Sequence, residues 1–208
     1  MSARDTMLAR IRQASSGGSV DTAAVIGARQ CGPQPAPYAD LTAQFVERAQ
    51  RLASTVVHVD SRGEVPHAVA RYLESQNLNR AALCWPEFLD LNWIHSRIAV
   101  AARPPEPEDE IGITGAFCAL AETGTLMLCS GRDTPAATSL LPETHVAVVA
   151  CERIVATMEA AWALLRQERG VLPRAVNFIS GPSRTADIEQ TVTLGAHGPA
   201  RVLIVLVG

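Results

Sequence analysis

Apolar runs rich in β-branched residues, alternating with helical patterns, dominate the chain from residue 55 onward. The two strongest runs are HVAVVA at 145–150 and RVLIVLVG at 201–208, and shorter ones lie at 55–60, 80–85, 97–103 and 174–180. Helical patterns lie between them at 64–76 and 152–167, and another helix is expected to begin near Thr185. Strands this apolar, separated by helices, predict a Rossmann-like, mostly parallel sheet with helices on both faces.

The segment before residue 55 has a different pattern. Ser2 is a plausible N-cap for a helix reaching about Ala14, and Asp40 can cap a second helix over 41–54. A loop rich in Gly and Pro separates the two. We therefore predict an N-terminal helical arm over residues 1–54 and one α/β domain over residues 55–208.

One segment of the predicted domain, residues 111–131, breaks the strand–helix alternation. Its part CALAETGTLMLCSG reads as two short strands around a turn, an extra β-hairpin. The bend of this hairpin consists of Glu122, Thr123, Gly124 and Thr125.

Composition excludes several classes of protein. The net charge is −3, which gives no basic footprint for nucleic acid. All 18 positive side chains are arginines, so a Walker P-loop and a Schiff-base lysine are excluded. No apolar run reaches the ~20 residues of a membrane span, and the charged start does not resemble a secretory signal. These observations lead us to expect a cytoplasmic protein.

Local motifs for metals and cofactors are also missing. The five cysteines form no CxxC pair, and no two histidines have the i,i+4 spacing of a helical metal site. The GxGxxG and GxSxG motifs do not occur. We therefore predict neither a metal nor a cofactor.

The segment ISGPSRTADIE combines an apparent strand end, a Gly-Pro turn and a helix start. Parallel sheets bind ligands beyond the carboxyl ends of their strands, and free N–H groups at a helix start bind anions. Candidate ligand-binding residues are Gly181, Ser183, Arg184, Thr185, Asp187, His197 and Gly198. Thr123, Gly124 and Thr125 of the hairpin join them on the family resemblance described next. The alternative is that Ser183 and Thr185 only cap the helix and that Gly181 only permits a tight turn.

The AETGT hairpin and the SGPSRTADIE…GAHGP segment together resemble the lactate-utilisation (LUD) domain family. Within that family the similarity is to LutC-type members, which consist of the domain alone. The resemblance implies a fold like that of the NagB/RpiA/CoA-transferase group and a cleft between the hairpin and the 181–189 loop.

The resemblance also implies a function. LutC-type proteins belong to a system that oxidises L-lactate to pyruvate with two iron–sulfur partner proteins. We therefore expect a subunit without an iron–sulfur cluster that binds a small anionic ligand or a partner. One alternative is an acyl- or CoA-transferase with Glu122 as its catalytic nucleophile, because Glu122-Thr123-Gly124 is similar to a short turn in transferases of this fold. The other is a regulatory sensor without catalysis.

Overall fold

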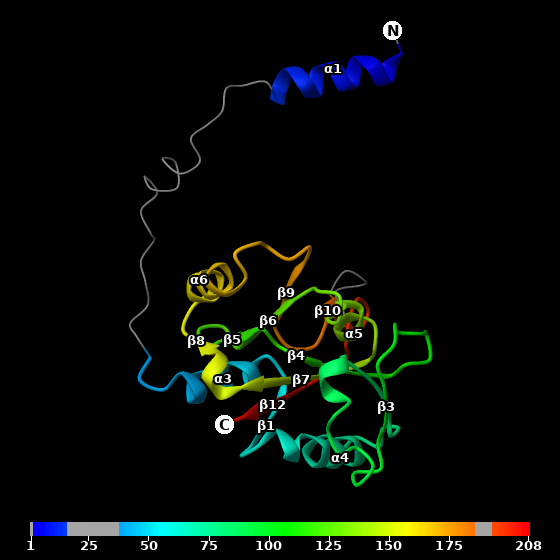
Figure 1. Cartoon of the computed structure of the whole chain (residues 1–208), viewed down its shortest axis with the longest axis vertical. Helices are drawn as coiled ribbons and strands as arrows, with labels where there is room; N and C mark the ends of the chain where they lie inside the picture. The colour runs from blue at the N-terminus through cyan, green and yellow to red at the C-terminus, as the bar shows by residue number, and fades with distance from the viewer. Residues whose placement is uncertain (1, 16–37, 186–192) are drawn as a thin grey trace. The chain divides into compact units, whose positions relative to one another are not determined.

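The computed structural model describes residues 2–15, 38–185 and 193–208, which fall into two compact units, Met1–Pro37 and Tyr38–Gly208 (Figure 1). The first unit contains α1 (Ala3–Ser15). The Asp5 backbone N–H donates to Ser2 Oγ at 3.3 Å, and the Ser2 backbone N–H donates to the Asp5 carboxylate at 2.9 Å. This reciprocal pair confirms the predicted helix and its Ser2 cap.

The larger unit begins with α3 (Leu41–Arg51), which the Asp40 side chain caps by accepting from the backbone N–H of Ala43 at 3.0 Å. Phe45 and Ala49 of this helix are fully buried in the main hydrophobic core. The helix is thus part of the larger compact unit, Tyr38–Gly208. The predicted domain boundary after residue 54 stays a prediction.

A six-stranded, fully parallel sheet forms the centre of this unit and confirms the predicted fold class. Its strands, in spatial order, are β1 (Thr55–Val59), β12 (Arg201–Val207), β7 (Thr144–Ala150), β4 (Ile111–Gly115), β2 (Ala81–Cys84) and β3 (Ala99–Ala101). The central strands β4, β7 and β12 are buried along almost their whole length, because other elements cover both of their faces. This burial explains their nearly unbroken apolar sequences.

Helices and short 3-10 turns connect and flank the strands. The helix α4 (Val65–Ser75) packs against β1 and β12, α3 packs against β1, and α5 (Ala137–Leu140) packs against β4 and β7. The 3-10 turns are η1 (Arg62–Glu64), η2 (Pro86–Phe88) and η3 (Cys151–Arg153). Each of these three turns follows the carboxyl end of a main-sheet strand, so their side chains lie at that edge.

The predicted hairpin is present and belongs to a second, four-stranded sheet. The strand order is β8 (Ile154–Val155), β5 (Cys118–Leu120), β6 (Thr125–Cys129) and β9 (Val176–Ile179). The helix α6 (Met158–Arg169) covers this sheet and forms with it a separate apolar cluster that includes Met127 and Leu165. The strand β9 was expected in the main sheet but pairs antiparallel with β6.

One predicted helix start is wrong, and another borders residues outside the described part of the chain. The helix expected from residue 152 begins at Met158, because the Thr157 hydroxyl caps it and Ile154–Val155 pair with β5. At the start expected near Thr185, the residues Arg184–Thr185 form β10, which pairs antiparallel with β11 (Thr193–Leu194). Ser183 therefore precedes a short strand, and residues 186–192, over which the helix was expected to continue, lie outside the described residues.

The strand β4 was not recognised from the sequence, because its segment IGITG contains two glycines. A Cβ at Gly112 would lie 1.9 Å from the carbonyl oxygen of Thr138, so only glycine allows the α5 segment to cross the strand this closely. Glycine here serves packing on a buried strand rather than a turn.

Candidate functional site

The two motifs singled out in the sequence lie side by side. The hydroxyls of Thr125 and Ser180 are 2.7 Å apart, because Leu126 of β6 pairs with Ile179 of β9. The AETGT turn and the start of the 181–189 loop are therefore neighbours, as the sequence interpretation required.

The glycines of both motifs face the carboxyl-terminal part of α3. Gly124 has φ +69°, and a Cβ there would lie 2.4 Å from the backbone nitrogen of Ala49. Gly181 has φ +78°, and a Cβ there would lie 2.2 Å from the carbonyl oxygen of Leu52. Helix packing thus accounts for both glycines, and their role in ligand binding stays a prediction.

The remaining hairpin candidates differ in exposure. Glu122 is half-buried and its backbone N–H donates to the Ala156 carbonyl at 3.0 Å, which ties the turn to the segment after β8. Thr123 is exposed, whereas Thr125 is buried. Only Glu122 and Thr123 of these three therefore present a side chain with access to solvent.

Residues 183 and 195–199 form the other candidate group. The Ser183 backbone N–H donates to the Pro199 carbonyl at 2.8 Å, and the Gly195 N–H donates to the Ser183 carbonyl at 3.0 Å. A Cβ at Gly198 would touch the Ser183 side chain at 3.4 Å. Ser183 and Gly198 are thus brought together, while Arg184 and His197 are exposed. Asp187 and the side chain of Thr185 lie outside the part of the chain that the structure describes.

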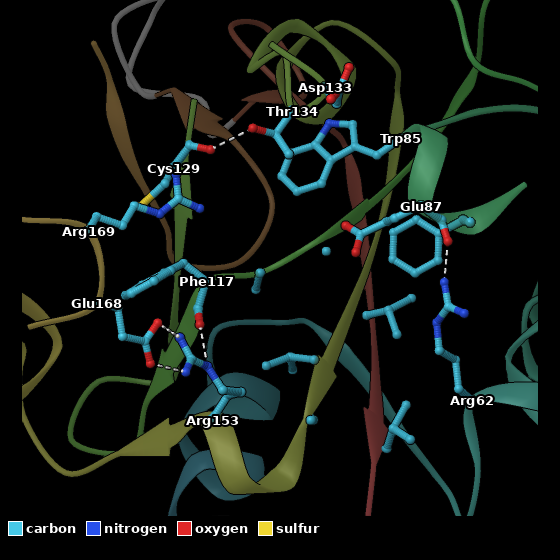
Figure 2. A pocket seen from close by; sticks show the side chains of 17 residues that line it. Arg62, Trp85, Glu87, Phe117, Cys129, Asp133, Thr134, Arg153, Glu168 and Arg169 are labelled. Atoms are coloured by element: carbon cyan, nitrogen blue, oxygen red, sulfur yellow. Dashed lines mark hydrogen bonds and ion pairs between the residues drawn. The ribbon is translucent and has the colours of Figure 1, made fainter. Parts of the chain in front are cut away.

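A cleft of about 680 Å³ opens elsewhere, at the carboxyl ends of β2, β4, β7 and β12 (Figure 2). Its floor is apolar and small, and consists of Gly115, Ala116, Val148, Val149, Ala150 and Val207. Charged side chains line its walls: Arg62, Glu87, Asp133, Arg153, Glu168 and Arg169. None of the site residues predicted from the sequence that the structure describes lines this cleft.

One wall of the cleft is built around Phe117, at the start of β5. The guanidinium of Arg153 lies 4.8 Å from the Phe117 ring centroid, and that of Arg169 lies 5.5 Å from it. Arg153 donates through Nε to the Phe117 carbonyl at 2.9 Å and through both terminal nitrogens to the Glu168 carboxylate. This bidentate pair raises the pKa of Arg153 and lowers that of Glu168. Arg153 is therefore fixed and largely neutralised, whereas Arg169 makes no ion pair with any described residue.

The opposite wall carries Glu87 and Arg62 (Figure 2). Arg62 donates to Asp90 at 2.7 Å and to the backbone carbonyl of Glu87, and its guanidinium lies 5.6 Å from the Phe88 ring centroid. The Glu87 carboxylate lies over Gly115, where a Cβ would come within 2.8 Å of Oε1. Partial loss of hydration raises the pKa of Glu87, and the nearby Arg62 charge opposes that rise.

Fixed polar contacts hold the rim between these walls. The Trp85 indole N–H donates to the Pro135 carbonyl at 3.3 Å, and the Thr134 hydroxyl donates to the Cys129 carbonyl at 2.9 Å.

Within residues 2–15, 38–185 and 193–208, no three His, Cys, Asp or Glu side chains gather as a metal site requires. The arrangement suits an organic anion held by the Arg169 guanidinium over an apolar floor.

The sequence signal for this cleft is the set of residues that follow the parallel strands, but the sequence interpretation assigned the site to the 181–189 loop. Ligands are expected beyond the carboxyl ends of parallel strands. Glu87 comes shortly after β2, Phe117 shortly after β4 and Arg153 shortly after β7. The 181–189 loop instead follows β9, which belongs to the second sheet.

A parallel six-stranded sheet with a hairpin-containing second sheet and a cleft at the carboxyl edge defines a Rossmann-like α/β protein with a ligand-sized site. Residues 108–207 match the family described as the LUD domain, so this half of the chain is similar to LUD-domain proteins. Arg62, Trp85, Glu87 and Phe88 of the cleft lie before the matched stretch.

Relatives with curated names share this region. Lactate utilization protein C of Bacillus subtilis is 42% identical over 100 residues, covering 47% of this chain and 42% of that protein. Lactate utilization protein C of an Exiguobacterium species is 40% identical over 119 residues, covering 56% and 52%. The matched stretch thus spans about half of the length of these relatives or less.

A solved structure extends the similarity to most of the chain. The crystal structure of a DUF162 family protein from Deinococcus radiodurans matches with a TM-score of 0.58 and 26% identity, covering 84% of this chain and all of that one. Separately, none of the helices in the described part of the chain has the length and apolar character needed to cross a membrane.

The described cysteines differ sharply in accessibility. Cys84, Cys118 and Cys129 are buried, and burial raises the pKa of Cys84 to about 11 and that of Cys118 to about 12. Cys151 is partly exposed at the carboxyl edge of the main sheet, with Sγ 3.4 Å from His58 Nε2. In a Cys31→Ser background, we expect Ellman's reagent to titrate one thiol rapidly in the native protein and all four in urea.

The matched control is the Cys31→Ser/Cys151→Ser double variant, which should show no rapid phase. A second fast thiol in the native Cys31→Ser protein would contradict the burial of the other three cysteines.

Proposed function

We propose that the protein acts in lactate utilization as a component without an iron–sulfur cluster, working with iron–sulfur partner proteins and binding an organic anion. The names of the curated relatives and the LUD domain match support the lactate context. The binding part of the proposal rests on one observation, the cleft at the carboxyl edge of the main sheet in which Arg169 makes no ion pair with a described residue.

We propose this cleft, rather than the space between the AETGT turn and the 181–189 loop, as the place where the anion binds. Gly124 and Gly181 back closely onto α3, so a ligand has no room on the Cβ side of either glycine. The cleft offers Arg169 without an ion-pair partner among the described residues, above the Phe117 ring. A guanidinium that is held by an aromatic ring and is not neutralised by a carboxylate is well suited to a carboxylate or phosphate.

The transferase alternative depends on Glu122. Glu122 lies at the turn end of the β5–β6 hairpin, while the cleft is lined by Phe117 and Cys129 at the open end of the same hairpin. A nucleophile in this cleft would therefore have to come from other residues. Formation of a covalent acyl adduct on Glu122 with an acyl-CoA would support the transferase proposal instead.

A genetic complementation experiment tests the proposed function. In a host that lacks its own copy of the gene and is grown on L-lactate as carbon source, Arg169→Gln is expected to slow growth several-fold relative to the wild type. The matched control is Arg166→Gln, which alters an exposed arginine of the same helix away from the cleft. Equal growth of wild type, Arg169→Gln and a full deletion would refute the lactate role.

A further inference from the structure

We propose that the occupant of the cleft is a phosphorylated nucleoside, and not the 2-hydroxy acid itself. This inference rests on the proposed function in taking the same cleft as the binding site. It adds the class of ligand: a flat base over the floor, sugar hydroxyls at Glu87 and phosphate at Arg169.

The volume of the cleft exceeds what a small hydroxy acid needs. The cleft measures about 680 Å³, within the range of sites that enclose drug-sized and cofactor-sized ligands. L-Lactate would fill only a small part of this volume and would leave the opposite wall unused. A larger ligand with groups for both walls fills this volume more completely.

The floor of the cleft suits a flat, apolar group. Ala116 and Ala150 are small and partly exposed, and they present apolar atoms rather than long side chains to the cleft. The Trp85 indole lies at the rim, where its bond to the Pro135 carbonyl fixes its orientation. A planar, largely apolar group can lie flat against such a surface, as a nucleobase does on aromatic and aliphatic atoms.

The Phe117 wall supplies the anion subsite. Arg153, Glu168 and Arg169 together leave one net positive charge, because Arg153 is neutralised by its bidentate pair with Glu168. Arg153 keeps its position through the bond to the Phe117 carbonyl. Arg169 therefore carries the available positive charge. Its planar guanidinium can donate two hydrogen bonds to two oxygens of one phosphoryl group.

The Glu87 wall supplies the acceptor for hydroxyl groups. Among the described residues, no side chain or backbone N–H donates to the Glu87 carboxylate, since Arg62 is engaged by Asp90 and by the backbone carbonyl of Glu87. The missing side chain at Gly115 leaves the carboxylate room to lie over the end of β4. Vicinal hydroxyls are suitable donors for such a carboxylate, and dinucleotide-binding α/β proteins use an acidic residue in this way.

Calorimetric titration of the full chain tests the inference. We expect ADP to bind at least tenfold more tightly than adenosine, and both to bind more tightly than L-lactate or inorganic phosphate. Arg169→Gln should weaken ADP binding about tenfold while leaving adenosine binding unchanged, because it removes only the phosphate contact. Glu87→Gln should weaken both ligands, and Arg166→Gln should change neither.

Circular dichroism of each variant verifies that the fold is kept. Failure of AMP, ADP, GDP, CDP and UDP to bind the folded wild type would overturn the inference. L-Lactate binding as tightly as ADP, with loss in Arg169→Gln, would overturn it too and leave the proposed lactate role standing. Growth on lactate tests that role separately, so the two failures are distinguishable.

Discussion

Replacing Gly124 with alanine is expected to lower the free energy of unfolding by about 3–5 kcal/mol. Gly124 has φ +69°, and its new Cβ would lie 2.4 Å from the Ala49 nitrogen and 2.5 Å from the Arg48 carbonyl carbon. Both are backbone atoms of α3, so the clash is relieved only if the helix or the hairpin moves. Urea unfolding followed by tryptophan fluorescence and circular dichroism measures the loss.

Gly170 provides a matched control, because it has a similar φ of +64° but no atom lies within 4 Å of the position that a new Cβ would take. Gly170→Ala should cost only the backbone term of about 1 kcal/mol. Gly181→Ala should resemble Gly124→Ala, since its Cβ would meet the Leu52 carbonyl oxygen at 2.2 Å. Equal losses at Gly124 and Gly170 would show that contact with α3 does not explain the glycine of the AETGT motif.

Acidification is expected to destabilise the protein through His145. This side chain is fully buried in β7, and burial lowers its pKa to about 4. The unfolded chain binds a proton near the ordinary histidine pKa of about 6.5, whereas the folded protein does so only near 4. The contribution of the neutral His145 ring to the free energy of unfolding is therefore fully present above pH 6.5. It is lost as the pH falls toward 4, by about 3 kcal/mol in total.

The local contacts of His145 explain why its ring stays neutral. Nε2 lies 2.8 Å from the Thr114 hydroxyl, while Nδ1 has no hydrogen-bond partner among the described residues. A charged ring would need a second acceptor, and burying a charge without one is costly. Loss of hydration is the cause of the shift, and no carboxylate among the described residues opposes it.

Two measurements separate His145 from the other titrating groups. An NMR titration of the histidine ring carbons should show one resonance, assigned by His145→Gln, that does not shift between pH 7.5 and pH 5. The free energy of unfolding should also fall less steeply with decreasing pH in His145→Gln than in the wild type. An NMR pKa near 6.5 for this resonance would contradict the prediction.

Regular elements were predictable wherever a local pattern determined the structure. The apolar runs that became β7 and β12, the caps at Ser2 and Asp40, and the hairpin all follow from nearest neighbours in the sequence. The start of α6 was misplaced because residues 154–155 pair with a strand more than thirty residues earlier, and helical periodicity does not encode that pairing. The pattern at Ser183–Thr185 is typical of a helix start, but Arg184 and Thr185 pair with residues 193–194, a contact that the local pattern does not encode.

The candidate site was less predictable than the fold. Its charged groups come from η1, η2, η3, the loop after β6 and the last turn of α6, which meet only after the two sheets have packed together. Arg169 and Glu87 stand in no motif, and each looks like an ordinary surface residue in the sequence. The sequence interpretation instead placed Gly124 and Gly181 in the site. The structure explains both glycines by their close approach to α3.

The position of β12 has a consequence for how the protein is made. This strand is the last element of the larger unit in sequence order, yet it lies between β1 and β7 inside the main sheet. During synthesis, the edges of β1 and β7 therefore stay unpaired until residues 201–207 have left the ribosome. Such non-local pairing slows folding, and exposed strand edges promote aggregation of the nascent chain. We expect the yield of correctly folded protein to depend on chaperones that shield these edges until β12 inserts.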